Sequence, residues 1–133
     1  MSPAERDRFD DLLEEAIEAL PPRIRALLDE MPVIALDEPT PEMLRDLGMR
    51  PGEEEELCGL HTGVENTRRT VEASGELPSQ IHLFRRGIVA AAGGWRQRRA
   101  DDRIYDEIMT TLLHEIGHQM GLDEDDLERL GYG

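Results

Sequence analysis

The sequence has no lysine, a single cysteine and very few aromatic residues. All 15 of its basic residues are arginine, and 30 aspartate and glutamate residues outnumber them, which leaves a formal net charge of −15. A charge of this sign repels phosphate backbones and anionic lipid surfaces, so we expect neither nucleic acid nor a membrane as a partner. The lone Cys58 excludes an internal disulfide and is typical of a reducing compartment.

Long apolar segments are also missing. No apolar run approaches the roughly 20 residues that cross a bilayer, and the first residues lack the basic and then apolar order of a secretory signal. We therefore expect a cytoplasmic protein. A chain of 133 residues can bury about two-thirds of its unfolded surface without disulfides, and no repeat or linker divides it. The sequence predicts a single domain over residues 1–133.

The negative charge is interrupted in the middle of the chain. Residues 61–100 hold three acidic and seven basic residues. The arginines Arg68, Arg69, Arg85 and Arg86 in this stretch are either ordinary solvated side chains or a rim that attracts an acidic ligand or partner.

The N-terminal part of the chain contains start and stop signals of helices. The run Ser2-Pro3-Ala4-Glu5 combines an N-cap, a proline at the first helical position and a capping-box glutamate, and Pro21-Pro22 ends the helix. A shorter helix is predicted from Pro22 to Met31, and the apolar run Val33–Leu36 predicts a buried strand. In the first helix, apolar residues recur on one face: Phe9, Leu12, Leu13, Ala16, Ile17 and Leu20.

The middle of the chain predicts short elements. Thr40-Pro41 and Gly48 are the start and stop signals of a helix. Residues 57–63 are expected to form a strand, and residues 64–79 a loop. The segment Gln80–Arg85 alternates between two faces and predicts a further strand, and Ile88–Ala92 is expected to form a turn of helix.

A long helix is predicted from Asp101 up to Gly121, where the chain turns. Within it, His114-Glu115-Ile116-Gly117-His118 matches the pattern H-E-x-x-H. At about 100° per residue, the two imidazoles lie about 40° apart and one turn apart along the helix axis, a spacing that lets both bind one metal ion. An apolar stripe on this helix is broad enough to form the centre of the core: Ile104, Tyr105, Ile108, Met109, Leu112, Leu113 and Ile116.

The residue types of this motif indicate zinc. Zinc accepts imidazole nitrogens, and a catalytic zinc site typically has three protein ligands and a water molecule. Two histidines without a metal would be costly to bury in so apolar a helix. Glu115 lies beside the two histidines without being a ligand itself. It is therefore placed to deprotonate a metal-activated water molecule, whose pKa the ion can lower to about 7.

A third ligand is expected just beyond the helix. Gly121 lets the chain fold back, so that an acidic residue can face the ion. By position the string is H-E-x-x-H-x-x-G-x-x-E, with Glu124 as its last residue. Asp125 and Asp123 are alternative ligands, and in a further alternative these acidic residues only cap a short C-terminal helix.

This string resembles the zinc signature of the Asp-zincins, H-E-x-x-H-x-x-G-x-x-D. The chain is more closely similar to the short bacterial zincin-like metallopeptidases, which consist of little besides the zinc domain. The similarity covers Gly59–Gly63, Leu77–Arg86 and His114–Gly133.

The resemblance implies a role for each residue of the motif. His114 and His118 bind zinc, Glu115 is the general base, and the residue at position 124 completes the site. Here this chain has glutamate instead of aspartate. The extra methylene moves the carboxylate by about 1.5 Å, so the backbone must adjust or a neighbouring acid must serve. Tyr132 is a second catalytic candidate, because its hydroxyl can point toward a developing oxyanion. Alternatively, its ring packs under the ligands or anchors the C-terminal helix.

In zincins an exposed edge strand pairs with an extended substrate through backbone hydrogen bonds, a mode that other peptide-binding proteins share. The segment Gln80–Arg85 is the candidate, so a peptide or protein substrate is expected to pair with the strand near Ile81–Arg85. His82 or Phe84 then faces the cleft; alternatively, His82 occupies an ordinary exposed strand position. For His61, packing is the expected role.

The fold class that follows is α+β, a minimal zincin-like metallopeptidase fold. A small mixed sheet of three or four strands packs on the long active-site helix, and further helices precede it at the N-terminus. The leading hypothesis is an enzyme, a zinc metallopeptidase that hydrolyses peptide bonds through a metal-activated water molecule. The alternative is a metal-binding or protein-interaction module with the same fold and little or no hydrolytic activity, which the small size of the chain favours.

Overall fold

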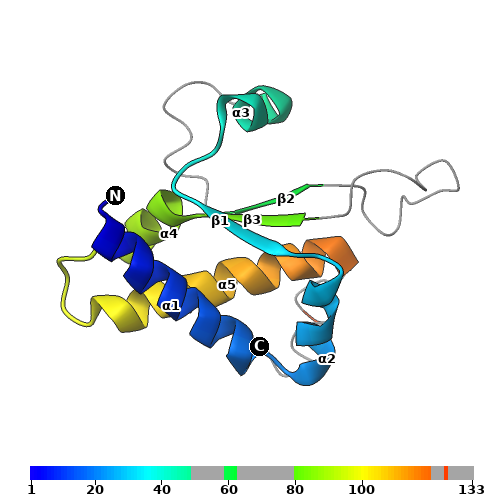
Figure 1. Ribbon diagram of the computed structural model, residues 1–133, viewed down its shortest axis with the longest axis horizontal. Helices are drawn as coiled ribbons and strands as arrows, with labels where there is room; N and C mark the ends of the chain where they lie inside the picture. The colour runs from blue at the N-terminus through cyan, green and yellow to red at the C-terminus, as the bar shows by residue number, and fades with distance from the viewer. Residues whose placement is uncertain (49–58, 63–79, 121–124, 126–133) are drawn as a thin grey trace, which may run out of the picture.

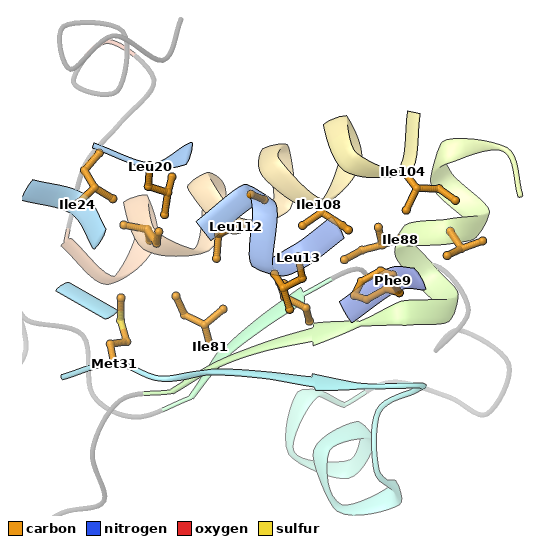
Figure 2. Packing of buried hydrophobic residues seen from close by; sticks show 14 of the residues in the cluster. Phe9, Leu13, Leu20, Ile24, Met31, Ile81, Ile88, Ile104, Ile108 and Leu112 are labelled. Atoms are coloured by element: carbon orange, nitrogen blue, oxygen red, sulfur yellow. The ribbon is translucent and has the colours of Figure 1, made fainter. Parts of the chain in front are cut away.

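The protein is a helical assembly built around a three-stranded sheet. The computed structural model describes residues 1–48, 59–62, 80–120 and 125, and for residues 46, 47, 59–62 and 118–120 it describes the backbone alone. Helices α1 and α5 lie on one side of the sheet and the short helix α3 lies on the other (Figures 1 and 2). The predicted α+β fold class is confirmed.

Helix α1 (Pro3–Ala19) begins and ends where the sequence predicts. The Ser2 hydroxyl accepts a hydrogen bond from the backbone N–H of Glu5 at 3.2 Å, and the Glu5 carboxylate accepts one from the backbone N–H of Ser2 at 2.9 Å. This reciprocal cap satisfies two donors that a helix start leaves unpaired. The helix ends just before the two prolines, because proline lacks the N–H that a helix interior needs.

Three short elements follow α1. Helix α2 (Pro22–Arg25) passes into a 3₁₀ helix, η1 (Ala26–Asp29), so the predicted second helix is present but tightens in its second half. Strand β1 (Val33–Leu36) matches its predicted bounds.

Helix α3 (Pro41–Leu47) also has its predicted bounds. The Thr40 hydroxyl accepts a hydrogen bond from the N–H of Met43 at 3.2 Å. At the other end, Gly48 adopts a left-handed conformation at φ +70°, which closes the helix.

Strand β3 lies in the middle of the sheet. Strands β2 (Gly59–Thr62) and β3 (Gln80–Phe84) pair antiparallel, and β1 pairs with the opposite edge of β3 in parallel, which gives the order β1-β3-β2. The expectation that this segment is an exposed edge strand is therefore wrong. Both of its edges already hydrogen-bond neighbouring strands, so a substrate strand near Ile81–Arg85 has no free backbone groups to pair with.

Helix α4 (Arg85–Ala92) begins at the residue that follows β3, without a connecting loop. It is longer than the single turn predicted, and its first residue was expected to belong to the strand. The backbone N–H of Arg86 donates to the carbonyl of Asp37 at 3.0 Å, which joins the start of α4 to the end of β1. Gly93 and Gly94 then turn the chain at φ +108° and +91°, which are backbone conformations that side chains other than glycine rarely adopt.

Helix α5 (Ala100–Met120) is the long helix of the prediction and forms the centre of the core. Figure 2 shows its buried residues facing those of α1 and the sheet. Among the described residues, no helix is long and apolar enough to cross a membrane. The core combines residues from α1, the sheet, α4 and α5: Phe9, Leu13, Ile81, Leu83, Ile88, Ile104, Ile108, Leu112 and Ile116.

An ion-pair cluster ties α1, β1 and α4 together. The Arg85 side chain, only 13% exposed, lies 3.0 Å from an Asp10 carboxylate oxygen and 3.2 Å from one of Asp37. Arg6 pairs with Asp37 at 2.7 Å. The hydrogen bonds from Arg6, and secondarily those from Arg85, hold the pKa of Asp37 below its ordinary value. Arg85 therefore pairs with carboxylates of its own chain and is not part of a rim that awaits an acidic ligand.

Candidate functional site

The H-E-x-x-H motif lies in the C-terminal half of α5. The helix is continuous from Ala100 to Met120, so positions 114 and 118 are one turn apart on the same helix. This continuity is the backbone arrangement that binding of one ion by two helical histidines requires.

The motif occupies one flank of α5, between solvent and core. Leu112 is fully buried and Glu115 is 8% exposed, whereas His114 is exposed, so the expectation that the helix buries both histidines is wrong for His114. At about 100° per residue, position 114 is about 160° around the helix from Leu112, position 118 about 120° and position 115 about 60°, all in the same direction. The glutamate therefore lies at the inner border of this flank and His114 at its outer border.

Burial distinguishes Glu115 from the other acidic side chains that the structure describes. A glutamate is seldom buried to this degree unless its carboxylate has a partner or a function. Thr111 is the other buried polar residue among the described side chains of α5, one turn before Glu115 and about 100° around from Leu112 on the same flank. Thr111 is not part of the H-E-x-x-H pattern, so the sequence did not predict it. Its only signal in the sequence is a polar residue one turn before the glutamate in an apolar helix.

His82 and Phe84 lie on the face of the sheet away from α5. Their neighbours Ile81 and Leu83 belong to the core cluster with Ile108, and side chains alternate along a strand. His82 was expected either to face the substrate cleft or to be exposed to solvent. Its side chain lies on the face of the sheet opposite to the helix that carries the motif, and it is only 6% exposed, so neither expectation is met. Its Nδ1 atom has no hydrogen-bond partner within the described part of the chain, and burial lowers its pKa.

Several predicted site residues lie outside the described residues. These are Glu124, Asp123 and Tyr132, and of His118 only the backbone is described. Asp125, the remaining candidate ligand, is described and exposed. Residue 61 pairs with Ile81 across the sheet, with only its backbone described. In residues 1–48, 59–62, 80–120 and 125 there is no group of three side chains that could hold a metal ion.

The described part of the motif fits zinc. It provides an imidazole at an exposed position of a regular helix, a second histidine position one turn later, and a carboxyl group at the border between them and the core. Imidazole nitrogen is a preferred zinc ligand, and a nearby carboxylate that does not bind the ion is the usual proton acceptor. The residues present are thus those that a hydrolytic zinc site needs on one helix.

Comparison with known proteins agrees with this chemistry. A family model described as zincin-like metallopeptidase matches residues 28–133, all but the first 27 residues of the chain. No curated protein matches the chain significantly.

Proposed function

The chain belongs to the zincin-like metallopeptidase family, and we propose that it is a zinc-dependent peptidase that hydrolyses bonds in a peptide or protein substrate. One observation supports this most directly. The only nearly buried glutamate among the described residues is Glu115, which adjoins the exposed His114 on the helix that carries the motif. A merely solvated motif would leave both side chains exposed.

We propose that His114, His118 and Glu124 hold the zinc ion, with Asp123 and Asp125 as the alternatives to Glu124. When bound, zinc polarises the substrate carbonyl and makes a water molecule acidic enough to lose a proton near neutral pH. The helix fixes the spacing of the two histidines, so their contribution is to pre-organise the site.

Glu115 is proposed as the general base. It takes a proton from the attacking water molecule and returns it to the leaving amine, a role that needs a carboxyl group held in one place beside the reacting atoms. Burial at the border of the core restricts the rotamers of this side chain. Tyr132 is proposed to donate its hydroxyl to the developing oxyanion.

The substrate is proposed to pair with the sheet as an additional strand. Because β3 is central, the pairing edge must belong to an outer strand. Strand β2 contacts α5, whereas β1 lies on the far side of β3. Within the described residues nothing pairs with the outer edge of β2, so we propose that edge for an extended peptide.

Replacing Glu115 by glutamine tests the proposal. Glutamine has nearly the same shape but cannot accept the proton, so peptide cleavage should fall by about 100-fold or more while the zinc content, measured by elemental analysis, stays unchanged. The half-buried Glu107, two turns earlier on α5, provides the matched control. The variant Glu107→Gln should keep full activity.

Three other outcomes would change the proposal. Unaltered cleavage by Glu115→Gln would remove this residue from the mechanism. A wild-type protein that contains zinc but cleaves nothing in a broad peptide library would instead be a metal-binding or protein-interaction module. Full zinc affinity in Glu124→Ala would exclude that residue as a ligand.

We also propose that residues 1–133 fold as a single domain and that the protein is cytoplasmic. The first proposal is supported by α1, which precedes the region matched by the family model yet packs in the same core as α5. The second rests on composition, chiefly the single Cys58. Cell fractionation tests it.

A further inference from the structure

A mostly apolar groove lies at the end of the molecule away from the motif. It has a volume of about 210 Å³ and lies between the start of α1, one side of α4 and the connection from α4 to α5. This volume suits one large apolar side chain rather than an extended ligand. Its lining consists of Met1, Glu5, Arg86, Val89, Ala90 and Trp95.

The Trp95 side chain, which forms one side of the groove, is positioned by contacts within the protein. The Arg8 guanidinium carbon lies 4.6 Å from the centre of the indole ring. The indole Nε1 atom is buried and has no hydrogen-bond partner among the described residues. The Gln97 side chain donates to the carbonyls of Ala92 and Gly94, at 2.6 and 2.9 Å, which clamps the connection that carries Trp95.

The same connection carries a net positive charge, although the chain as a whole is acidic. Residues 93–103 contain four arginines and two aspartates. The aspartates are already paired, Asp101 with Arg8 and Asp102 with Arg99. The remaining Arg96, Arg98 and Arg103 are exposed and form no ion pair with any described residue.

Arg86 adds a further cation at the groove itself. Among the described residues it forms an ion pair with Glu38, 3.3 Å away, and both side chains are more than half exposed. A pair of this kind contributes about 0–1 kcal/mol, because water solvates both charges almost as well. A carboxylate that arrives with a ligand can therefore replace Glu38 at little cost.

The groove is remote from the proposed zinc site. Helix α5 begins at Ala100, next to this connection, and His114 follows 14 residues later. At about 1.5 Å per residue, the two lie about 21 Å apart along the helix. A ligand in the groove does not occupy the catalytic centre.

We propose that this groove docks a peptide segment in which one bulky apolar side chain is flanked by acidic residues. The apolar side chain fills the space between Trp95 and Val89, and the flanking carboxylates meet Arg86 and the exposed arginines of residues 96–103. The net charge of −15 opposes this only weakly at physiological salt, because charges farther than about 8 Å are largely screened. Glu5 is the one acidic residue of the lining, and its carboxylate already accepts the cap hydrogen bond from Ser2. The proposal is independent of catalysis, so a failed peptidase assay leaves it standing.

Trp95 allows a direct test, because it is the only tryptophan of the chain. The full protein is titrated at 0.15 M NaCl with the acetylated and amidated peptide Glu-Asp-Leu-Asp-Glu while tryptophan fluorescence is recorded. A saturable change is expected, with a Kd on the order of 0.1 mM, as for one apolar anchor with a few ion pairs. Peptides with serine in place of leucine, or lysine in place of each acid, should bind at least tenfold more weakly.

Two alanines of α4 provide matched variants. Ala90 and Ala91 are both exposed, but only Ala90 lines the groove. Ala90→Glu places a negative charge and extra volume in the groove and should weaken binding at least tenfold. Ala91→Glu adds the same charge beside it and should change the Kd less than twofold. Circular dichroism checks that both variants remain folded.

Four results would overturn the proposal. The first is equal binding of the acidic and lysine peptides, and the second is equal loss of binding in both alanine variants. The third is sedimentation showing a wild-type dimer that Ala90→Glu dissociates, since a second copy would then occupy the groove. Equal saturation by N-acetyl-leucine amide would also count against it, as it would reduce the site to a pocket for small apolar molecules.

Discussion

At the residue scale, local signals in the sequence were sufficient wherever the chemistry involves near neighbours. Ser2, Thr40 and Gly48 all have the capping roles that their residue types predict. The burial of His82 was not predictable in this way. Alternation assigns it to a face of the sheet, but whether that face is covered depends on segments distant in sequence.

Buried His82 should make the protein sensitive to mild acid. Burial lowers its folded-state pKa below the ordinary value of about 6.5. The unfolded chain therefore binds more protons in this range, and the free energy of unfolding should fall as the pH drops below about 6.5. Above that pH the histidine is neutral in both states and the effect disappears.

The variant His82→Leu isolates this contribution. Leucine cannot titrate, so urea unfolding between pH 7 and pH 5 should show a smaller loss of stability in the variant than in the wild type. Both proteins share the other three histidines, whose contributions cancel in the comparison. Identical pH slopes would mean that His82 titrates normally in the folded protein.

At the element scale, the sequence predicts which elements form better than how they are arranged. The helices α1 and α3 and the strand β1 were predicted within a residue at their ends. The central position of β3 was not, because periodicity tells which face of a strand is buried and contains no information about its neighbours. The residues 64–79 of the predicted loop lie outside the described part of the chain.

The contact between α1, β1 and α4 depends on Asp37. Replacing it by asparagine removes the charge that Arg6 and Arg85 share. We expect the free energy of unfolding to fall by about 1–3 kcal/mol, as for hydrogen bonds to charged groups that are partly buried. Urea denaturation at pH 7 measures the change.

The neighbouring residue provides the control for this variant. Among the described residues, Glu38 forms an ion pair only with the exposed Arg86 side chain, so Glu38→Gln should lower stability by less than about 1 kcal/mol. Because the pKa of Asp37 is lowered in the fold, its contribution is present above the ordinary carboxyl pKa of about 3.9 and is lost as the pH falls below that value. Equal losses in the two variants would argue against a special role for Asp37.

At the scale of the whole molecule, α1 and α5 share one core although the family model matches only residues 28–133. Phe9 of α1 is fully buried in this core, and Arg85 lies 5.9 Å above its ring. Phe9→Ala should lower the free energy of unfolding by about 3–5 kcal/mol, because it leaves a large cavity. The half-buried Leu12 on the same helix is the control, and Leu12→Ala should cost less.

The unfolding transition of Phe9→Ala also tests whether the chain is a single domain. If residues 1–133 are one domain, Phe9→Ala should shift a single cooperative transition, seen alike by far-ultraviolet circular dichroism and by the fluorescence of Trp95 near the start of α5. An early transition of α1 alone, with the rest unfolding as in the wild type, would show that the N-terminal helix is a separate unit.

The candidate site was predictable as far as it lies on one helix. The H-E-x-x-H spacing and the helical period together place His114 and His118 on α5, and the structure adds that Glu115 is buried. The strand proposed to pair with substrate, β2, was not predictable, since strand order depends on long-range pairing. Thr111 was also missed, because a lone threonine in an apolar helix has no motif that marks it.

The direct passage from β3 into α4 restricts how the chain can vary in length. Phe84 ends the strand and Arg85 starts the helix, with no spare residue between them. An insertion there would rotate every later α4 side chain by about 100° around its axis. Ile88 would then move into the position of Val89, and Val89 would move into the exposed position of Ala90. This junction therefore fixes the rotation of α4 about its own axis relative to the sheet. Relatives of different length must accommodate their extra residues elsewhere.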